Sequence, residues 1–409
     1  MTVDGAVPIY HKVDAGNTED STTHRETWEV LRALVGRPDF LYVADCKLCV
    51  KGTMNHLHEQ KGRFLTVVPN SRKEVAWFRE YLQAHVPAWV DAPLTENELD
   101  AGETGPKWRT VEAAERSKEG FRIVWVWSRE KEQRDQMTRA AAIHKALRNL
   151  DGLEKRLQSP RCKIRTQEGV VEAAERARGT AGAQWVDHEI RVEELPRFKQ
   201  EKRGRPGKNT RFRRGVRRRF HVVGRRNEGT IAFDTKSDGM FPLITNDEKL
   251  TGTEMLARYK SQSYLEKRFE QLKTVFGVAP VNLKKVTRVE ALLFLYFLAL
   301  LMQSLIEREI RQGMVRGKLE SLPIYPEDRE CEAPTTGRLL KLFEEVVVQR
   351  IWQGDRLVHV EQPKLAETQR QVLRLLGTSE SVYQVPAPRM VAPSPRWQFE
   401  FKRGSECGK

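Results

Sequence analysis

The sequence has few cysteines, and their arrangement defines neither a disulfide framework nor a zinc site. There are five in 409 residues, an odd number. Cys46 and Cys49 form a Cys-x2-Cys motif, but no second pair follows it, and His56 and His58 complement it poorly. Because a structural zinc ion takes four ligands, we interpret the two cysteines as small residues beside a buried strand. This cysteine usage is typical of a protein in the reducing cytoplasm.

Long apolar segments are also lacking. The opening residues, MTVDGAVPIYHKV, have neither the basic region nor the apolar core of a secretory signal peptide. The run ALLFLYFLALLM at residues 291–302 is the main candidate for a membrane span, but it is shorter than the roughly 20 residues that a spanning helix needs. Glu290, Gln303 and Glu307 flank it closely. We therefore expect a helix buried on all sides, no membrane association and a cytoplasmic location.

Acidic residues are outnumbered by basic ones, 56 to 71, which gives a formal net charge of +15 and a pI near 9.6. Such a balance favours a polyanionic partner. Charge alone does not separate DNA from RNA or from an acidic membrane surface. Acidic residues are nearly absent from one segment, residues 197–226, so the excess of positive charge is concentrated there.

This basic segment is the strongest candidate for contact with phosphates, which cations neutralise with a salt-dependent affinity. Within it, Arg203-Gly204-Arg205-Pro206 has the form of a hook that reads a DNA minor groove. A flexible basic connector is the alternative that we favour for a motif of only four residues. The predicted DNA-binding residues of the segment are Arg203, Arg205, Arg213, Arg214, Arg217, Arg218 and Arg219.

Helix-like and strand-like segments alternate in residues 1–85, which predicts an α/β fold. Helices are expected at 23–34, 53–60 and 72–85, and strands at 40–45 and 63–68. The first strand is a short apolar run of the kind that is buried on both faces. Asp45 stands where it ends, and chemistry in open α/β sheets collects at the carboxyl ends of strands.

The middle of the chain, residues 86–228, breaks this alternation. It holds a Trp-rich strand at 121–127 and then a long amphipathic helix. The hexapeptide Val-Glu-Ala-Ala-Glu-Arg occurs at 111–116 and again at 171–176, and both copies suit a helix. We infer no duplicated domain from so short a repeat.

Further strands are expected after the basic segment, with Asp238-Gly239 as a hairpin turn rather than a catalytic position. Beyond residue 313 the chain is expected to be helical and to end in a loose tail that contains several prolines. The strands are expected at residues 219–223, 230–233 and 240–245.

One predicted helix, at residues 251–276, carries the most regular pattern in the chain. Thr251 and Glu254 form a capping box at its start, and Gly277 is a natural terminator. An apolar stripe recurs at steps of four, three and four residues and is expected to face a core. The stripe consists of Leu265, Phe269, Leu272 and Phe276.

A polar row follows the same predicted helix. Tyr259, Glu266 and Lys273 are seven residues apart, so they share one face, and Gln262 joins them. The neighbours of Glu266 four residues away are Gln262 and Glu270, so no helical salt bridge accounts for it. We interpret Glu266 as a candidate metal ligand, with a solvated face as the alternative. Lys273 is the clearest candidate for binding phosphate.

This row resembles the Tyr-x2-Arg-x3-Glu-x6-Lys signature of a large group of bacterial insertion-sequence transposases, the DDE cut-and-paste enzymes. Tyr259, Glu266 and Lys273 match at that spacing, and Gln262 stands where the family has Arg.

A second segment, residues 45–85, resembles the second-aspartate region of the same family. It follows a strand that ends Val-Ala-Asp and contains a helix and then Gly-Arg-Phe-Leu-Thr-Val-Val-Pro. Together the resemblance covers residues 1–85 and about 229–380, while residues 86–228 look like the insertion that such family members carry.

The resemblance implies a ribonuclease-H-like α/β core that cleaves and joins DNA with two Mg²⁺ or Mn²⁺ ions. Asp45 and Glu266 would be the second and third catalytic carboxylates and metal ligands, while Tyr259, Gln262 and Lys273 would lie along the DNA. The implied partner is double-stranded DNA, at insertion-sequence ends and at the target, with room for a homodimer.

The expected domain organisation follows from the same comparison. The first part of the core and the signature helix are separated by the insertion, and a helical region closes the chain. The predicted bounds are 1–85 for the first part of the core, 86–228 for an α+β insertion with a basic linker at 197–226, 229–313 for the second part of the core with the signature helix, and 314–409 for the helical C-terminal region and tail.

The family's first aspartate has no counterpart at the end of a predicted strand. Asp4, Asp14 and Asp20 all stand in turn-like or loop-like sequence. We therefore expect a transposase chain that lacks the first strand of its core, binds DNA and does not cleave it by itself. Two alternatives remain: a non-catalytic DNA-binding protein or inhibitor of an intact transposase, and an RNA-associated basic protein.

Overall fold

The computed structural model of the chain describes residues 1–2, 4–15, 17–95, 105–201, 204–207, 210–278 and 280–384. The chain divides into two compact units. We call residues 15–262 the sheet unit, and residues 1–14 together with the chain from residue 263 on the helical unit. This division differs from the predicted domain bounds, and each unit is described by itself.

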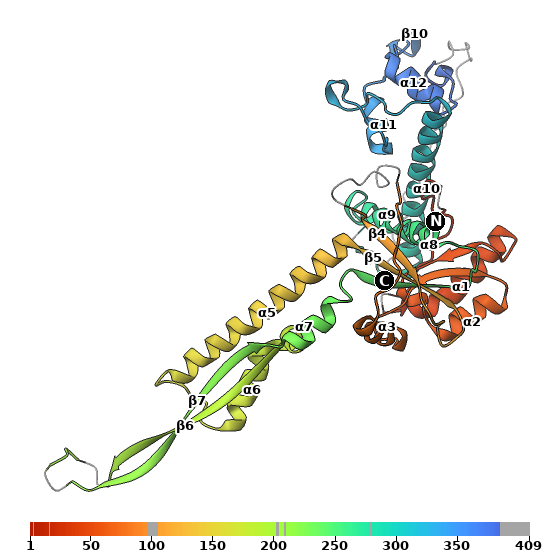
Figure 1. Ribbon diagram of the computed structural model, residues 1–409. Helices are drawn as coiled ribbons and strands as arrows, with labels where there is room; N and C mark the ends of the chain where they lie inside the picture. Colours follow the sequence, from red (N-terminus) through yellow and green to blue (C-terminus); the bar gives the residue numbers. More distant parts are fainter. Residues whose placement is uncertain are drawn as a thin grey trace, which may run out of the picture. The chain divides into compact units, whose positions relative to one another are not determined.

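The sheet unit is built on a six-stranded mixed sheet (Figure 1). The strands lie in the order β1-β2-β8-β5-β4-β3, in which β1 and β2 are parallel and every other neighbouring pair is antiparallel. The chain is therefore a mixed α/β protein, as predicted at the level of fold class. The strands are β1 (Leu41–Val43), β2 (Arg63–Val67), β3 (Val90–Asp91), β4 (Trp108–Glu112), β5 (Arg122–Ser128) and β8 (Met240–Thr245).

The predicted alternation of helices and strands up to residue 85 is confirmed. The helices are α1 (Asp20–Val35), α2 (Lys51–Glu59) and α3 (Lys73–Ala84), with a short 3-10 helix η1 (Cys46–Leu48) after β1. One detail is wrong: the prediction buries β1 on both faces, whereas its three residues are only half-buried. The reason is its position, because β1 is an edge strand of the sheet.

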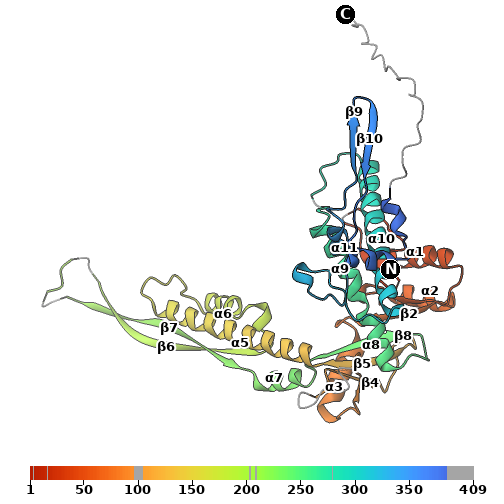
Figure 2. The same ribbon diagram turned by 90° about the horizontal axis from the view of Figure 1, so that it is seen from above.

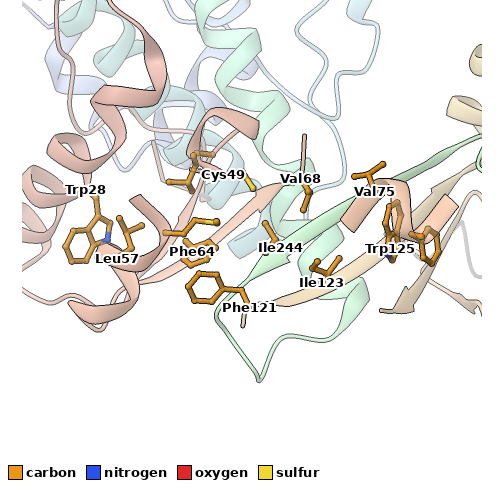
Figure 3. Close-up of a cluster of buried hydrophobic side chains, with 14 of the residues drawn as sticks. Trp28, Cys49, Leu57, Phe64, Val68, Val75, Phe121, Ile123, Trp125 and Ile244 are labelled. Carbon is orange, nitrogen blue, oxygen red and sulfur yellow. The ribbon is translucent and has the colours of Figure 1, made fainter. Parts of the chain in front are cut away.

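Both faces of the sheet are covered, because successive side chains along a strand point to opposite faces. On one face, Trp28 and Phe64 belong to a buried cluster beneath α1, α2 and α3 (Figure 3). Phe78 of α3 stacks on Trp125 of β5 in this cluster, with ring centroids 3.8 Å apart. On the other face the strands pack against α8 (Gly252–Lys260).

A long helix and a two-stranded ribbon extend from this sheet (Figures 1 and 2). Helix α5 follows β5 without a loop, and Ser128 caps it by accepting a hydrogen bond from the Lys131 N–H at 3.3 Å. A second buried cluster, which includes Leu150, Val170 and Phe220, joins α5, α6 and the ribbon. The elements are α5 (Arg129–Gln158), α6 (Gln167–Gly182), β6 (Val186–Gln200) and β7 (Phe212–Arg226).

Two predictions for the middle of the chain are wrong. The first copy of the repeated hexapeptide, at 111–116, begins in strand β4, and only the second copy, at 171–176, is helical, in α6. The strand predicted at residues 230–233 is absent, because these residues lie in α7 (Glu228–Thr235). Asn227 starts this helix, because its side chain accepts a hydrogen bond from the Thr230 N–H at 3.0 Å.

The described part of the helical unit has four α-helices, two short 3-10 helices and one hairpin that no sequence pattern predicts. Its core joins α10, α11 and α12 through Ile310, Leu339 and Val372. The predicted tail at the end of the chain lies outside the described residues. The elements are α9 (Gln262–Thr274), α10 (Val286–Arg316), α11 (Thr336–Leu342), β9 (Gln349–Gln353), β10 (Arg356–Glu361) and α12 (Glu367–Leu375).

Helix α10 corrects the expectation of an apolar helix buried on all sides. Its apolar half leaves Leu295 62% and Met302 60% exposed, and its buried residues stand mainly in the later half, from Leu300 on. The helix extends to 31 residues, well beyond the apolar run that predicted it. Within the described residues it is the one helix long and apolar enough, by length and composition, to cross a membrane.

Candidate nucleic-acid interface

The helix that carries the transposase-like signature is interrupted. The predicted capping box of Thr251 and Glu254 is present at the start of α8, but that helix ends at Lys260 and α9 begins at Gln262. At Ser261 the hydroxyl donates a hydrogen bond to the Arg258 carbonyl at 2.6 Å. Serine side chains compete in this way with regular helical bonding. The prediction of one unbroken helix at residues 251–276 is therefore wrong.

The interruption separates the members of the polar row. Tyr259 packs in the sheet unit beside Phe241, with ring centroids 6.2 Å apart. Gln262 is the last residue of that unit, while Glu266 and Lys273 are exposed residues of α9 in the helical unit. Hence a shared helical face no longer aligns the four side chains.

The apolar stripe of α9 does not face a core either. Phe269 is 53% exposed, and the buried residue of α9 is Arg268. The Arg268 guanidinium forms an ion pair with Glu307 of α10 at 2.8 Å, and both side chains are almost fully buried. It also donates to the carbonyl oxygens of Gly5 and Ala6 at 3.4 Å. A buried ion pair thus joins α9 to α10, and Phe276 of the stripe, just beyond the end of α9, stacks on Tyr296 of α10 with ring centroids 6.1 Å apart.

Asp45 lies two residues after the last residue of β1, at the carboxyl end of the strand, and its side chain is 54% exposed. One carboxylate oxygen accepts a hydrogen bond from the Lys47 N–H at 3.0 Å and so caps η1. The same oxygen lies 3.8 Å from Nε2 of His24, whose Nδ1 is 2.9 Å from the Tyr42 hydroxyl. Burial, and then the charge of Asp45, raise the pKa of Tyr42, so this hydroxyl stays protonated.

The described side chains do not assemble a metal site. Asp45 and Glu266 belong to different units, and their proximity stays a prediction. No group of three or more His, Cys, Asp or Glu side chains in the described ranges could hold a metal ion. Cys49 belongs to the buried cluster of the sheet, and burial raises the pKa of its thiol to about 11, as suits a small core residue. We therefore derive no metal-dependent step from this geometry.

The ribbon formed by β6 and β7 is the most distinctive charged feature of the sheet unit. Its two strands have 15 residues each and pair in one unbroken antiparallel register from Val186↔Arg226 to Gln200↔Phe212. Most of the predicted basic linker at 197–226 is therefore strand, and Gly204-Arg205-Pro206 of the hook-like motif lie between the two strands, where Arg205 is exposed. Arg203 lies outside the described residues.

The part of the ribbon nearest the sheet is supported by helices. Opposite residues share a face in an antiparallel pair, and here both members of every pair are even-numbered or both are odd-numbered. The even-numbered residues Val186, Phe220 and Val222 are buried against α5 and α6. Gly224 permits close approach, since a β-carbon there would meet the Leu150 side chain at 2.8 Å.

The outer part of the ribbon, residues 193–200 and 212–219, runs on past the end of α5 (Figures 1 and 2). Most of its side chains are exposed on both faces. We call its odd-numbered side the cationic face and its even-numbered side the aromatic face. The cationic face carries Arg197, Lys199, Arg213, Arg217 and Arg219, and the aromatic face carries Pro196, Phe198, Phe212, Arg214, Val216 and Arg218.

The charges of the ribbon are balanced near the helices and unbalanced toward the tip. Arg219 pairs with Glu193 at 3.7 Å and Arg218 with Glu194 at 3.2 Å. Farther out, the exposed Arg213, Arg214 and Arg217 have no ion pair with any carboxylate of the described chain. The outer ribbon therefore presents a positive charge that no described protein group neutralises.

The sequence pattern predicts the arginines of β7 as DNA-binding residues but not their partners on β6 or the aromatic face. It assigns no role to Arg197, Lys199 or Phe198. The signal that could have found them is the strand period of two: four of the five apolar residues of β7 stand at the even positions 212, 216, 220 and 222, and Val223 is the exception. Dense arginine between them obscures that alternation.

Comparisons with known proteins add no relative to this geometry. No protein-family model, no curated protein and no solved structure matches the chain.

Proposed function

We propose that the chain binds double-stranded DNA through the ribbon, as part of a DDE transposase with a ribonuclease-H-like core. The observation that carries the DNA-binding part is the unneutralised charge of Arg213, Arg214 and Arg217 on the outer ribbon. Phosphate groups are the partners that release counterions when such cations approach, and this release supplies most non-specific affinity for DNA.

The dimensions of the ribbon suit this partner. Fifteen residues per strand, at about 3.4 Å each, give a length of roughly 50 Å. A DNA major groove about 12 Å wide admits a two-stranded ribbon. Because the outer ribbon is exposed on both faces, it can enter a groove or follow the backbone without displacing another element of the described chain.

The transposase part of the proposal rests on the resemblance to the family signature. It assigns catalysis and the binding of Mg²⁺ or Mn²⁺ to Asp45 and Glu266, and contact with DNA to Tyr259, Gln262 and Lys273. Supporting it are the position of Asp45 at the carboxyl end of β1 and the exposure of Glu266 and Lys273 on α9. For this function the Asp45 and Glu266 carboxylates must approach each other. The proposal places the chain in the cytoplasm, on a DNA duplex, and leaves room for a homodimer.

A second candidate function is DNA binding without catalysis. One observation favours it: the Asp45 carboxylate already caps η1 through the Lys47 N–H, a structural role that accounts for an aspartate at this position. In this case the chain would occupy DNA, and Glu266 would be a solvated residue.

The salt dependence of DNA binding tests the ribbon directly. The triple variant R213Q/R214Q/R217Q should bind duplex DNA more weakly. The slope of log K against log salt should flatten by about 0.9 for each phosphate that the variant no longer neutralises. The measurement is fluorescence anisotropy of a labelled duplex over a range of salt concentrations. Competition with a structured RNA of equal length should show whether DNA is preferred.

A matched control separates the ribbon from net charge. R134Q/K155Q/R176Q removes the same charge from exposed positions of α5 and α6, where the side chains are 69%, 76% and 79% exposed. This control should keep the salt slope of the unmodified chain. Equal weakening of binding in both triple variants, or no salt-dependent binding of the unmodified chain, would overturn the proposal.

A further inference from the structure

The aromatic face of the outer ribbon is unusual for a surface that faces water. Phe198 is 63% exposed, Phe212 51% and Val216 63%. Phe198 lies directly opposite Arg214, so Phe212 and Val216 are its diagonal neighbours on the same face. Diagonal neighbours in an antiparallel pair are within reach of aromatic side chains. The three residues therefore form one apolar patch with arginine at its centre.

This patch continues the face that α5 and α6 cover nearer the sheet. Val186, Phe220 and Val222 stand on the same even-numbered side and are buried there, whereas no described element covers Phe198 or Phe212. A two-stranded ribbon without a covering layer is only marginally stable in water. The two strands nevertheless pair regularly out to Gln200↔Phe212, which favours a partner that covers the aromatic face.

The charges around the patch select the kind of occupant. Arg214 and Arg218 stand on the aromatic face, and the cationic face lies behind it. Glu194 of the same face pairs with Arg218, whereas Arg214 has no ion pair with a described carboxylate, so a second copy of the ribbon would bring a further unneutralised arginine to this face. Nucleic-acid bases offer flat apolar surfaces joined to a negatively charged backbone, which matches aromatic side chains flanked by arginine.

We infer that Phe198 and Phe212 stack on unpaired bases, so that the ribbon binds DNA with a locally open duplex in preference to an intact duplex. This inference rests on the proposed DNA binding and specifies its substrate. The cationic face holds phosphates whatever the state of the bases. The aromatic face gains stacking only where bases have left the helix, because bases inside an intact duplex are already stacked.

The experiment compares two labelled DNAs of equal length and charge: a fully paired duplex, and the same duplex with four unpaired nucleotides on each strand at its centre. The unmodified chain should bind the open DNA more tightly, by roughly 5- to 150-fold for each base stacked. F198A/F212A should lose this preference while keeping its affinity and salt slope for the paired duplex. F198L/F212L, which keeps apolar area but lacks a ring, should lose most of it.

Val192 and Val223 provide the matched control, because both are exposed apolar residues of the ribbon outside the patch, at 42% and 38%. V192A/V223A should keep the preference for open DNA. Sedimentation of each variant shows whether the patch instead joins two copies of the chain.

The outcomes separate the inference from the proposed function. If the unmodified chain binds neither DNA, the proposed function fails. If it binds both DNAs equally, or if F198A/F212A keeps the preference, only the inference fails. Loss of self-association in F198A/F212A without any change in DNA preference would likewise overturn it, in favour of a second copy as the occupant.

Discussion

Single residues with the largest predicted effect on stability are the members of buried ion pairs. Arg139 of α5 and Asp238, just before β8, form a two-pronged pair in which both side chains are almost fully buried. Asp238 thus has a structural role, and the turn at Asp238-Gly239 joins α7 to β8 rather than the two strands of the expected hairpin. Removing one charge from such a pair strands the other in a poorly solvated site, which costs more than the pair itself contributes.

Asp238→Ala should therefore destabilise the sheet unit by about 3–5 kcal/mol. The measurement is urea unfolding followed by tryptophan fluorescence, to which Trp125 in the sheet contributes. The double variant Arg139→Met/Asp238→Leu should recover most of this stability, since it removes both charges. Glu130→Ala breaks an exposed pair with Arg134, in which the side chains are 78% and 69% exposed, and should cost less than about 1 kcal/mol. Equal effects of Asp238→Ala and Glu130→Ala would show that burial of the pair is unimportant.

Whole elements show where sequence patterns succeed and where they fail. The alternation up to residue 85 is predictable because each helix and strand there is short, apolar on its covered side and bounded by turns. The hexapeptide Val-Glu-Ala-Ala-Glu-Arg shows the limit. Its copy at 171–176 is helical, while the copy at 111–116 begins in β4, which is paired with β3 and β5. Pairing with other strands overrides the same local preference.

The predictions for the ribbon and the signature helix fail for local reasons. The ribbon resembles a connector because arginines outnumber apolar residues in β7, although four of the five apolar residues keep a period of two. The signature helix resembles a continuous one because its apolar and polar stripes fit a single helix. Ser261 stands at its interruption, and the buried residue of its second half is Arg268 rather than a member of the apolar stripe.

Gly224 sets how closely the ribbon lies on α5, so Gly224→Val tests this packing. A β-carbon at 224 would meet Leu150 at 2.8 Å and Leu147 at 3.1 Å, and overpacking of this kind typically costs about 1–3 kcal/mol. We expect a lower thermal midpoint and faster proteolysis within β6 and β7.

The control for this variant is Gly215→Val in the outer part of the same strand. A β-carbon there would have only an ordinary contact, with the Arg197 carbonyl oxygen at 3.7 Å. It should leave the thermal midpoint nearly unchanged. If Gly224→Val is as harmless as Gly215→Val, the ribbon is not held by its contact with α5.

At the scale of the whole molecule, pairing between segments far apart in the sequence determines the order of the strands, which local sequence patterns do not specify. Strand β8 joins β2 and β5 at the centre of the sheet although it follows them by more than a hundred residues. No local pattern specifies such a partner. The candidate catalytic pair has the same difficulty, because Asp45 and Glu266 stand in different units and only a shared ligand would show that they act together.

Binding of Mn²⁺ tests whether the two units share a site. If Asp45 and Glu266 coordinate one ion, Asp45→Asn and Glu266→Gln should each weaken Mn²⁺ binding by at least about 10-fold. The double variant should be little weaker than either single one, because residues that act as a unit are not additive. Titration calorimetry or the electron paramagnetic resonance signal of free Mn²⁺ gives the affinity without any assay of cleavage. Glu270→Gln, also on α9, is the control and should leave the Mn²⁺ affinity unchanged. If Glu266→Gln also leaves it unchanged, Asp45 and Glu266 do not coordinate one ion.

The direct passage from β5 into α5 has a mechanical consequence. Helix α5 is about 45 Å long and starts at the last residue of a central strand, while β7 returns through α7 to β8, the neighbour of that strand. At the base, the Gly239 N–H donates to Asp135 of α5 at 2.9 Å, and the Ser128 N–H donates to the Gly239 carbonyl at 3.0 Å. The helix and the ribbon together thus form a stiff arm that is anchored at the β5–β8 pair. A force applied at the outer end of the ribbon would exert a torque on the middle of the sheet.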